Sequence, residues 1–331
     1  MTEPVFSIQD LWVSVRTRRG LAAIVNGVDL SVDRGRTLAV VGESGSGKSM
    51  TMLAATGLTP PGLSVDGSVR LLGTDLRTMR PRHRRAFRGR HVGFVFQDPL
   101  SSLNPMMTVG RQIGEAYQLL QGRSRADARR RSIELLDQVG IPEPQERVGS
   151  YPHQFSGGMR QRVMIAMALA CEPELIIADE ATTALDVTIQ AQVIDLVSAL
   201  QAKLGTAVIW ITHDLGVVAG MADEVAVMYG GRIIEQAPVD ELFEHPAHPY
   251  TRALLAARPR IGDRSPLAAI PGSPPNPLQL PPGCAFYPRC PVRGDGRCAT
   301  ELPPLAPVGE NHLARTFYAD MAGALPSSGV P

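Results

Sequence analysis

Short apolar runs alternate with longer, helix-compatible segments over the first two thirds of the chain. Each run is nearly free of polar side chains, which is typical of a strand buried on both faces of a sheet. The runs are TLAVVG (37–42), VGFVF (92–96), ELIIAD (174–179) and AVIWIT (207–212). Helices are expected in KSMTMLAATGL (48–58) and at 108–121, 125–139, 157–170 and 188–204. This alternation predicts an α/β fold whose parallel sheet is covered by helices on both faces.

The pattern changes towards the end of the chain. VAVMYGGRIIEQ (225–236) contains two short strands around Gly230 and Gly231, which indicates a hairpin. From about residue 258 the composition shifts, because residues 259–309 carry many prolines and show little periodicity. We therefore expect one domain at 1–258 and an extension at 259–331. The extension would be a disordered tail unless something other than a hydrophobic core holds it.

Composition and charge narrow the class of protein. The chain has 331 residues and 44% apolar content, enough for one large and one small domain. Its net charge of +1 gives no argument for nucleic acid or an anionic membrane surface as a partner. No apolar run reaches about 18 residues, so no membrane span is expected. The first residues, MTEPVFSIQD, lack a signal pattern, and we expect a cytosolic chain.

A glycine-rich loop joins the first apolar run to its helix. GESGSGKS (42–49) fits the phosphate-binding pattern G-x-x-x-x-G-K-[ST] in the strand-to-helix context that the pattern requires. Its backbone N–H groups can curl around an anion, next to the partial positive charge of the helix start. Lys48 is expected to reach the β- and γ-phosphates and Ser49 to bind Mg²⁺. The loop residues expected to contact the phosphates are Gly42, Ser44, Gly45 and Gly47.

Two acidic residues follow the third apolar run. The apolar part of ELIIADE is buried, so Asp179 and Glu180 emerge at the carboxyl end of the strand, where open α/β sheets bind their ligands. Asp179 is the expected Mg²⁺ partner, directly or through water. Glu180 could orient and deprotonate an attacking water. The pair and the phosphate loop together indicate a site for a nucleotide and Mg²⁺.

Further motifs carry a resemblance to a known family. FSGGMRQR (155–162) resembles the signature sequence of ABC-type ATPases, usually written LSGGQ, and lies just upstream of ELIIADE as in that family. Gln97 resembles the Q-loop glutamine, Asp186 the D-loop aspartate and His213 the switch histidine. The resemblance implies a P-loop (RecA-like) nucleotide-binding domain with a helical subdomain at about 101–170. It implies that the catalytic residues are Glu180, His213 and Gln97, and that the Mg²⁺ ligands are Ser49, Gln97 and Asp179.

The signature segment implies an assembly. Ser156, Gly157 and Gly158 open a helix whose positive end suits a phosphate, yet the chain already has a phosphate loop. By resemblance, two subunits pair head to tail, with each ATP between the loop of one and the signature of the other, and Asp186 is also expected to contact nucleotide. ATP closes this dimer, and hydrolysis by Glu180 releases it. Segment 98–110 would meet two transmembrane permease subunits, with an ordinary surface loop as the alternative.

A narrower resemblance covers nearly the whole chain. It implies a peripheral ATPase at the cytoplasmic face of the membrane that powers peptide import with an identical or sibling ATPase subunit and an external solute-binding protein. Importers of nickel and other small solutes share the same patterns, so they stay an alternative. A soluble ABC ATPase acting on nucleic acid or ribosomes is a second alternative. The segments that resemble oligopeptide and dipeptide importers are FQDPLSSLNPMMTVGRQI, YPHQFSGGMRQRVMIAMALA, HPAHPYTRALLAARP and IPGSPPNPLQLPPGCAFYPRCP.

The sequence departs from the family pattern at the position that stacks on adenine. The usual aromatic should fall near Val15 or Arg16, and neither is aromatic. Trp12 is close, but we expect it in the core rather than against the base. Arg16 offers an alternative stacking surface.

Three cysteines gather near the end of a chain with only one other. Cys284, Cys290 and Cys298 resemble three of four cysteines in the C-terminal region of peptide-importer ATPases, some of which hold an iron–sulfur cluster. Where the fourth is expected the chain has Arg315, and His312 nearby could serve as a ligand instead. An iron–sulfur cluster, a zinc ion on three cysteines and a histidine, and a metal-free site therefore all stay open.

Overall fold

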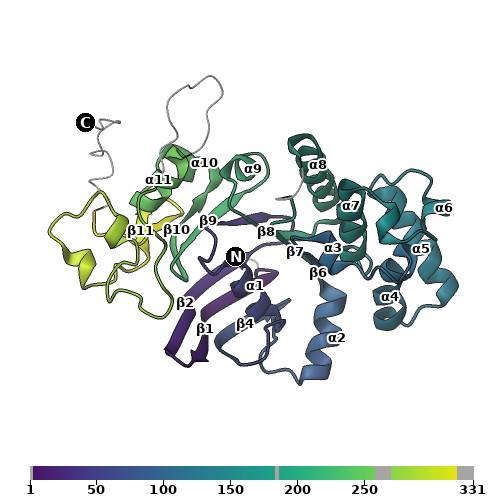
Figure 1. Cartoon of the computed structure of the whole chain (residues 1–331), viewed down its shortest axis with the longest axis horizontal. Coiled ribbons are helices and arrows are strands. Elements are labelled where there is room, and N and C mark those ends of the chain that lie inside the picture. Colours follow the sequence, from purple (N-terminus) through teal and green to yellow (C-terminus); the bar gives the residue numbers. More distant parts are fainter. Residues whose placement is uncertain (1–2, 183–185, 258–269, 319–331) are drawn as a thin grey trace. The chain divides into compact units, whose positions relative to one another are not determined.

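The computed structural model describes residues 3–182, 186–257 and 270–318 (Figure 1). They form two compact units, each assembled from separate stretches of the sequence. The first unit comprises Met1–Ser7, Ser31–Thr37 and Arg70–Thr212, and the second comprises Ile8–Leu30, Leu38–Val69 and His213–Pro331. The boundary expected at residue 258 lies outside the described residues, so the division into 1–258 and 259–331 stays a prediction.

Three parallel strands form the sheet of the first unit. They are β6 (Val92–Val95), β7 (Leu175–Asp179) and β8 (Ala207–Thr212), with β7 in the middle. Ala178 of β7 pairs with Val95 on one side and with Trp210 on the other. β8 is buried along its whole length, because apolar residues occupy both of its faces. The strands predicted here and their parallel arrangement are confirmed.

Helices make up most of the rest of the first unit. α4, α5 and α7 pack on one another (Figure 1), and α7 also packs on β6. The end of α7 lies so close to β6 that a Cβ at Gly93 would be 2.5 Å from the carbonyl oxygen of Ala168. The predicted helices agree with α4, α5, α7 and α8 to within two residues at each end. Besides the three parallel strands, the first unit contains β5 (Thr74–Asp75), α2 (Pro81–His91), α3 (Pro99–Ser102), α4 (Val109–Gln121), α5 (Arg125–Gln138), α6 (Pro144–Arg147), α7 (Gly157–Ala168) and α8 (Val187–Leu204).

The second unit contains parallel and antiparallel strands. β9 and β10 pair antiparallel, which confirms the hairpin predicted around Gly230 and Gly231, and β3 pairs parallel to β9. In spatial order the strands are β11 (Ala306–Gly309), β12 (His312–Ala314), β10 (Arg232–Pro238), β9 (Glu224–Tyr229) and β3 (Thr37–Val41). Its other elements include most of β1 (Phe6–Thr17), β2 (Gly20–Val32) and β4 (Leu63–Leu71), and the helices α1 (Lys48–Thr56), α9 (Leu215–Ala219), α10 (Val239–Glu244) and α11 (Pro249–Ala256).

The proline-rich extension shares a core with the rest of the second unit. Phe286 is 1% exposed, and its ring meets those of Tyr229 and Tyr250 at 5.3 Å in edge-on geometry. β12 adds to the sheet beside β10, with Ala314 paired to Glu235. The expectation that this segment lacks a conventional core is therefore wrong for residues 270–318. In the part of the chain that the structure describes, no helix is long and apolar enough to cross a membrane.

Candidate functional site

The phosphate loop of the second unit follows the buried strand β3 and leads into α1. Gly42 has a φ of 153°, and a Cβ there would lie 2.2 Å from the carbonyl oxygen of Met228 on β9. Gly47 has a φ of 105°, and its Cβ would lie 2.9 Å from the carbonyl oxygen of Ile24 on β2. A side chain would be strained at both positions and would have no room. Packing against β9 and β2 therefore sets the path of the loop.

Lys48 turns back over this loop. Its side chain is buried, and Nζ donates to the carbonyl oxygens of Gly42 at 2.8 Å and Glu43 at 3.1 Å. Ser49 follows in the first turn of α1, whose N-cap Gly47 has no side chain to accept hydrogen bonds from the first N–H groups of the helix. Lys48 and the helix start thus place positive charge at the loop, which suits phosphate groups. The exposed tip of the loop consists of Ser44 and Gly45.

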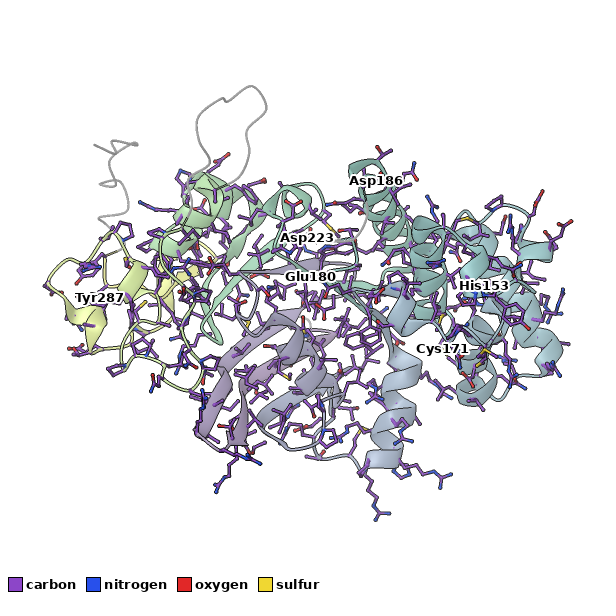
Figure 2. All side chains as sticks on the ribbon, in the orientation of Figure 1. His153, Cys171, Glu180, Asp186, Asp223 and Tyr287 are labelled. Carbon is purple, nitrogen blue, oxygen red and sulfur yellow. The ribbon has the colours of Figure 1, made fainter. Side chains whose placement is uncertain are left out.

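Gln97 and Glu180 meet in the first unit. They follow β6 and β7, two adjacent parallel strands, so both lie at the carboxyl edge of the sheet. Nε2 of Gln97 donates to Oε2 of Glu180 at 2.9 Å. The backbone of Glu180 has a φ of 48°, rare for a residue with a side chain, and its N–H donates to the carbonyl oxygen of Ile211 at 3.0 Å. The fold therefore holds an unusual backbone at the residue expected to act on water, whose place in the chain Figure 2 shows.

Asp179 ends β7 and is half-buried, immediately before this turn. Four apolar residues precede it in the strand and are fully enclosed. The sequence-based expectation that the carboxylate emerges at the carboxyl end of a buried strand is therefore confirmed.

The signature segment forms the start of α7. Ser156 is the N-cap, and its Oγ accepts a hydrogen bond from the N–H of Met159 at 3.4 Å. Ser156 and Gly157 are exposed, and apart from its chain neighbours and the adjacent backbone of α7, no described atom lies within 4 Å of the position that a Cβ on Gly157 would take. Gly158 is more crowded, because its Cβ would lie 2.9 Å from Cγ2 of Ile189 on α8. The start of α7 thus presents open space that a ligand or partner can occupy.

The two remaining motif residues lie at helix starts. Asp186, labelled in Figure 2, is the N-cap of α8, and its Oδ1 accepts from the N–H of Ile189 at 3.0 Å. The preceding part of its motif, residues 183–185, lies outside the described residues. His213 is exposed in the second unit, directly after β8 and just before α9. It belongs to the same unit as the phosphate loop, whereas Gln97 and Glu180 belong to the first unit.

The cysteines of the extension are buried or half-buried thiols. The N–H of Cys284 donates to the carbonyl oxygen of Cys298 at 2.8 Å, and Sγ of Cys290 donates to the carbonyl oxygen of Val292 at 2.9 Å. Burial raises the pKa of all three thiols, that of Cys284 to about 11. Among the described residues, no group of three or more histidine, cysteine, aspartate or glutamate side chains is arranged to hold a metal ion.

The residues considered for the fourth ligand position have other contacts. Nε2 of His312 lies 2.8 Å from Oε1 of Glu235, and its Nδ1 lies 3.5 Å from Oε1 of Glu241. The guanidinium of Arg315 donates to two backbone carbonyl oxygens. The side chains as arranged therefore do not fit the ligand set of a cluster or of a zinc ion.

Trp12 differs from its expected place. It is 39% exposed, so the expectation that it belongs to the core is wrong. Its Nε1 donates to Oδ1 of Asp10 at 2.6 Å, and the guanidinium of Arg232 lies 5.5 Å from the centre of its ring. The exposed part of its ring is therefore an aromatic surface on which adenine could stack, contrary to the expectation from the sequence.

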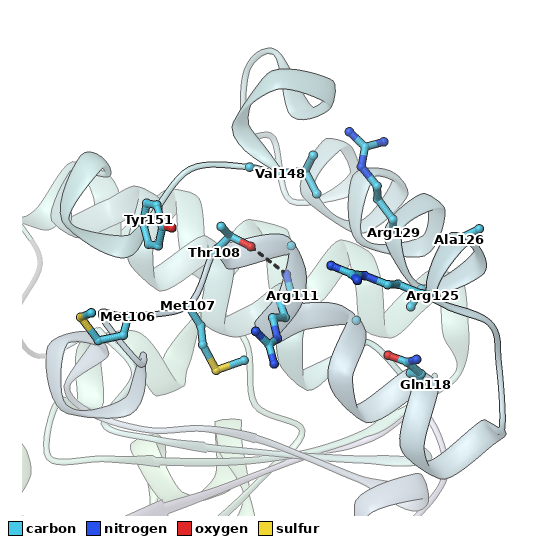
Figure 3. Close-up of a pocket in the computed structure, with 14 residues that line it drawn as sticks. Met106, Met107, Thr108, Arg111, Gln118, Arg125, Ala126, Arg129, Val148 and Tyr151 are labelled. Atoms are coloured by element: carbon cyan, nitrogen blue, oxygen red, sulfur yellow. Dashed lines mark hydrogen bonds between the residues drawn. The ribbon is translucent and has the colours of Figure 1, made fainter.

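The helical part of the first unit contains a groove of about 990 Å³. Met106 and Met107 lie towards one end, and Arg125 and Arg129 towards the other, with Arg111 between them (Figure 3). The methionines belong to the segment expected to contact a permease. The arginines come from α4 and α5 and could not be assigned to the groove from spacing alone.

One contact of the phosphate loop was not predictable from the sequence. Glu43 is bound by Arg289, which lies 246 positions later in the chain. Glu43 occupies a variable position of the loop pattern, so the pattern carries no information about a partner for its side chain.

Comparisons with known proteins show which family this chain resembles. The family model described as "ABC transporter" matches residues 25–183, and the one described as "Oligopeptide/dipeptide transporter, C-terminal region" matches residues 234–298. A putative peptide import ATP-binding protein of Brucella ovis is 48% identical over 327 residues, which covers 95% of this chain and 96% of the relative. The oligopeptide transport ATP-binding protein OppD of Haemophilus influenzae is 47% identical over 305 residues, covering 92% and 93%.

Solved structures extend this likeness to the fold. The dimeric post-hydrolysis structure of the ATP-binding cassette MJ0796 bound to ADP and Pi has a TM-score of 0.63 and 25% identity, and covers 71% of this chain and 98% of its own. The α/β fold and the resemblance seen in the sequence are both confirmed. The chain belongs to the ABC transporter family, among the ATP-binding subunits of the oligopeptide and dipeptide type.

Proposed function

We propose that this chain is the ATP-hydrolysing subunit of an importer that carries peptides across the cytoplasmic membrane. The observation that carries the catalytic part is the hydrogen bond between Gln97 and Glu180 at the ends of adjacent parallel strands. A carboxylate held there by its neighbour and by an unusual backbone is suited to orient a water molecule and accept its proton. Lys48, Ser49 and the loop glycines bind the phosphates in this proposal, and His213 assists hydrolysis.

Glu180→Gln is the test of this assignment. The amide keeps the size of the side chain but cannot accept the proton of water, so ATP should still bind while hydrolysis falls at least about a hundredfold. Phosphate release measures turnover, and a fluorescent ATP analogue measures binding.

Glu172→Gln is a matched control for this variant. Glu172 has the same residue type and a φ of 52°, but it lies before β7 and pairs with Arg131 at 2.9 Å. Its substitution should leave turnover within about twofold of wild type. If Glu180→Gln hydrolysed ATP at the wild-type rate, Glu180 would not be the residue that activates water.

Peptide transport is proposed from the relatives, because the likeness to peptide import proteins includes the C-terminal region as well as the ATPase part. Uptake of a labelled peptide by vesicles that contain this chain and its permease would support it. Uptake of nickel without peptide uptake would favour the importer of small solutes. Recovery with ribosomes or nucleic acid, and with no membrane subunit, would favour a soluble ATPase.

Magnesium is expected with the nucleotide. Ser49, Gln97 and Asp179 supply hydroxyl, amide and carboxylate oxygens, the donor types that Mg²⁺ takes in nucleotide sites. The ion would neutralise charge on the phosphates. These residues are proposed as its ligands on their chemistry and on the family pattern.

An iron–sulfur cluster on Cys284, Cys290 and Cys298 stays a prediction that the described side chains do not support. The pairing of His312 with two carboxylates favours a metal-free segment. Metal analysis of the anaerobically purified protein decides between iron, zinc and no metal.

The proposed assembly has a second ATPase subunit, identical or sibling, two permease subunits and an external solute-binding protein. The open space at the start of α7 supports a head-to-tail dimer, because another subunit's nucleotide can enter it. The groove beside Met106 supports a permease contact, since an apolar rim and three arginines suit a cytoplasmic helix with apolar and acidic residues. Docking there would hold the chain at the cytoplasmic face of the membrane.

A further inference from the structure

The C-terminal extension reaches the phosphate loop through an ion pair. Arg289, one residue before Cys290, donates from Nη1 to Oε2 of Glu43 at 2.6 Å and from Nη2 to Oε1 of the same carboxylate at 2.9 Å. Glu43 is the second residue of the loop. Two parallel hydrogen bonds form the most directional contact that arginine makes with a carboxylate. The extension therefore touches the part of the chain proposed to bind phosphates.

The surroundings of Arg289 fix its position. Its side chain is 5% exposed, and Nε donates to the carbonyl oxygen of Pro271 at 2.8 Å. The same guanidinium donates to the carbonyl oxygen of Ile270 at 3.2 Å and to Oη of Tyr229 at 3.1 Å. The hydrogen bonds to Glu43 are the main cause that raises the pKa of Arg289. A cation with acceptors at all three of its nitrogens cannot move without breaking several contacts.

Glu43 is held at three points. Its carboxylate binds Arg289, its N–H donates to Oη of Tyr250 at 2.8 Å, and its carbonyl oxygen accepts from Nζ of Lys48 at 3.1 Å. The residue that meets the extension is thus the same one that helps to place Lys48. An unpaired carboxylate at this position would also repel phosphate groups, because like charges at short range disfavour one another.

We propose that Arg289 is a positioning residue for nucleotide binding. It neutralises Glu43 and holds the loop in the shape that receives the phosphates, so the extension is part of the ATP site. The proposal rests on the proposed function, since it concerns the same loop. A purely structural role would differ from it: the ion pair would attach the extension, and the charge of Glu43 would not affect ATP.

Removing one charge and then both separates these roles. Arg289→Met leaves Glu43 unpaired, and it should raise the dissociation constant for ATP about tenfold and raise KM while kcat stays within about twofold. Adding Glu43→Gln removes the unpaired charge, and the double variant should recover affinity to within about threefold of wild type. Each full-length variant is titrated with a fluorescent ATP analogue, and its unfolding midpoint is measured without nucleotide.

Glu43→Gln alone gives a test that does not depend on the folding of an Arg289 variant. Its amide oxygen can still accept from Arg289, and the loop gains net positive charge, so ATP should bind about threefold tighter. A purely structural role predicts no gain in affinity, because the charge of Glu43 would then not affect ATP. Unchanged or weaker ATP binding by Glu43→Gln overturns the proposal, as does a double variant no better than Arg289→Met.

Failure of this inference differs from failure of the proposed function. If the wild-type chain binds no ATP analogue, the function itself is wrong. If wild type binds and Arg289→Met binds equally well, the function stands, and the ion pair only attaches the extension.

Discussion

At the scale of single residues, one buried carboxylate organises two histidines with opposite properties. Glu235 is fully buried and accepts hydrogen bonds from the N–H groups of Ala247 and His248 as well as from Nε2 of His312. The hydrogen bond to Glu235 is the main cause that raises the pKa of His312, whereas burial lowers the pKa of His248 to about 4. The raised pKa favours the charged ring of His312, and the lowered pKa favours the neutral ring of His248.

These shifts predict how stability depends on pH. A raised folded pKa means that the contribution of His312 is complete below its unfolded pKa of about 6.5 and is lost as the pH rises through the folded value. We expect His312→Asn to lower the free energy of unfolding by about 2 kcal/mol at pH 6, and the difference from wild type to shrink as the pH rises to 9. Chemical denaturation at several pH values measures this. A difference that grows with pH would contradict it.

His248 is expected to lower the free energy of unfolding as the pH falls. A lowered folded pKa means that the contribution of His248 is complete above about 6.5 and is lost as the pH falls towards 4. The two histidines therefore act on opposite sides of the stability profile.

At the scale of elements, two adjacent glycines at the start of α7 differ in the space around them. Space is open beside Gly157 but is filled by Ile189 beside Gly158. In a Glu180→Gln background, Gly157→Val should keep the unfolding midpoint and ATP binding, yet weaken ATP-driven pairing with the companion ATPase subunit at least tenfold, or about 1.4 kcal/mol. Analytical ultracentrifugation measures the pairing. Undiminished pairing would show that no partner enters this space.

Gly158→Val is the comparison for this variant. Its side chain would press on Ile189, so we expect a loss of about 1–3 kcal/mol in the free energy of unfolding. The two adjacent substitutions should therefore act on different properties, one on assembly and the other on folding.

The elements themselves were largely predictable, but their special backbones were not. Uninterrupted apolar runs located β6, β7 and β8, because these strands are buried on both faces, and the helix-compatible segments between the runs located α4 and α7. The positive φ of Glu180 and the packing of Phe286 depend on residues distant in the sequence, so no local pattern carries them. The motifs identified the candidate site residues, while the ion pair between Arg289 and Glu43 required the fold.

At the scale of the whole molecule, the groove in the helical part can be tested as a surface for the permease. Met106 is 84% exposed and lines the groove. Met106→Glu should weaken association with the permease about tenfold and reduce peptide uptake, because a carboxylate would replace an apolar contact. Basal ATP hydrolysis should not change. Co-purification with tagged permease subunits measures the association.

Leu119→Glu supplies the matched control, since Leu119 is 74% exposed and is not among the residues that line the groove. It should leave association and uptake unaltered. Equal losses in the two variants would mean that the groove is not the contact surface.

The packing of Phe286 against the adjoining rings of Tyr229 and Tyr250 has a consequence for how this protein can change over evolutionary time. Aromatic contacts and an added strand attach this segment through residues other than its cysteines. A cysteine of the extension can therefore be replaced by arginine during evolution without separating the extension from the rest of the second unit. The residues of the extension can therefore change in chemistry while the extension stays attached to the ATPase part of the chain.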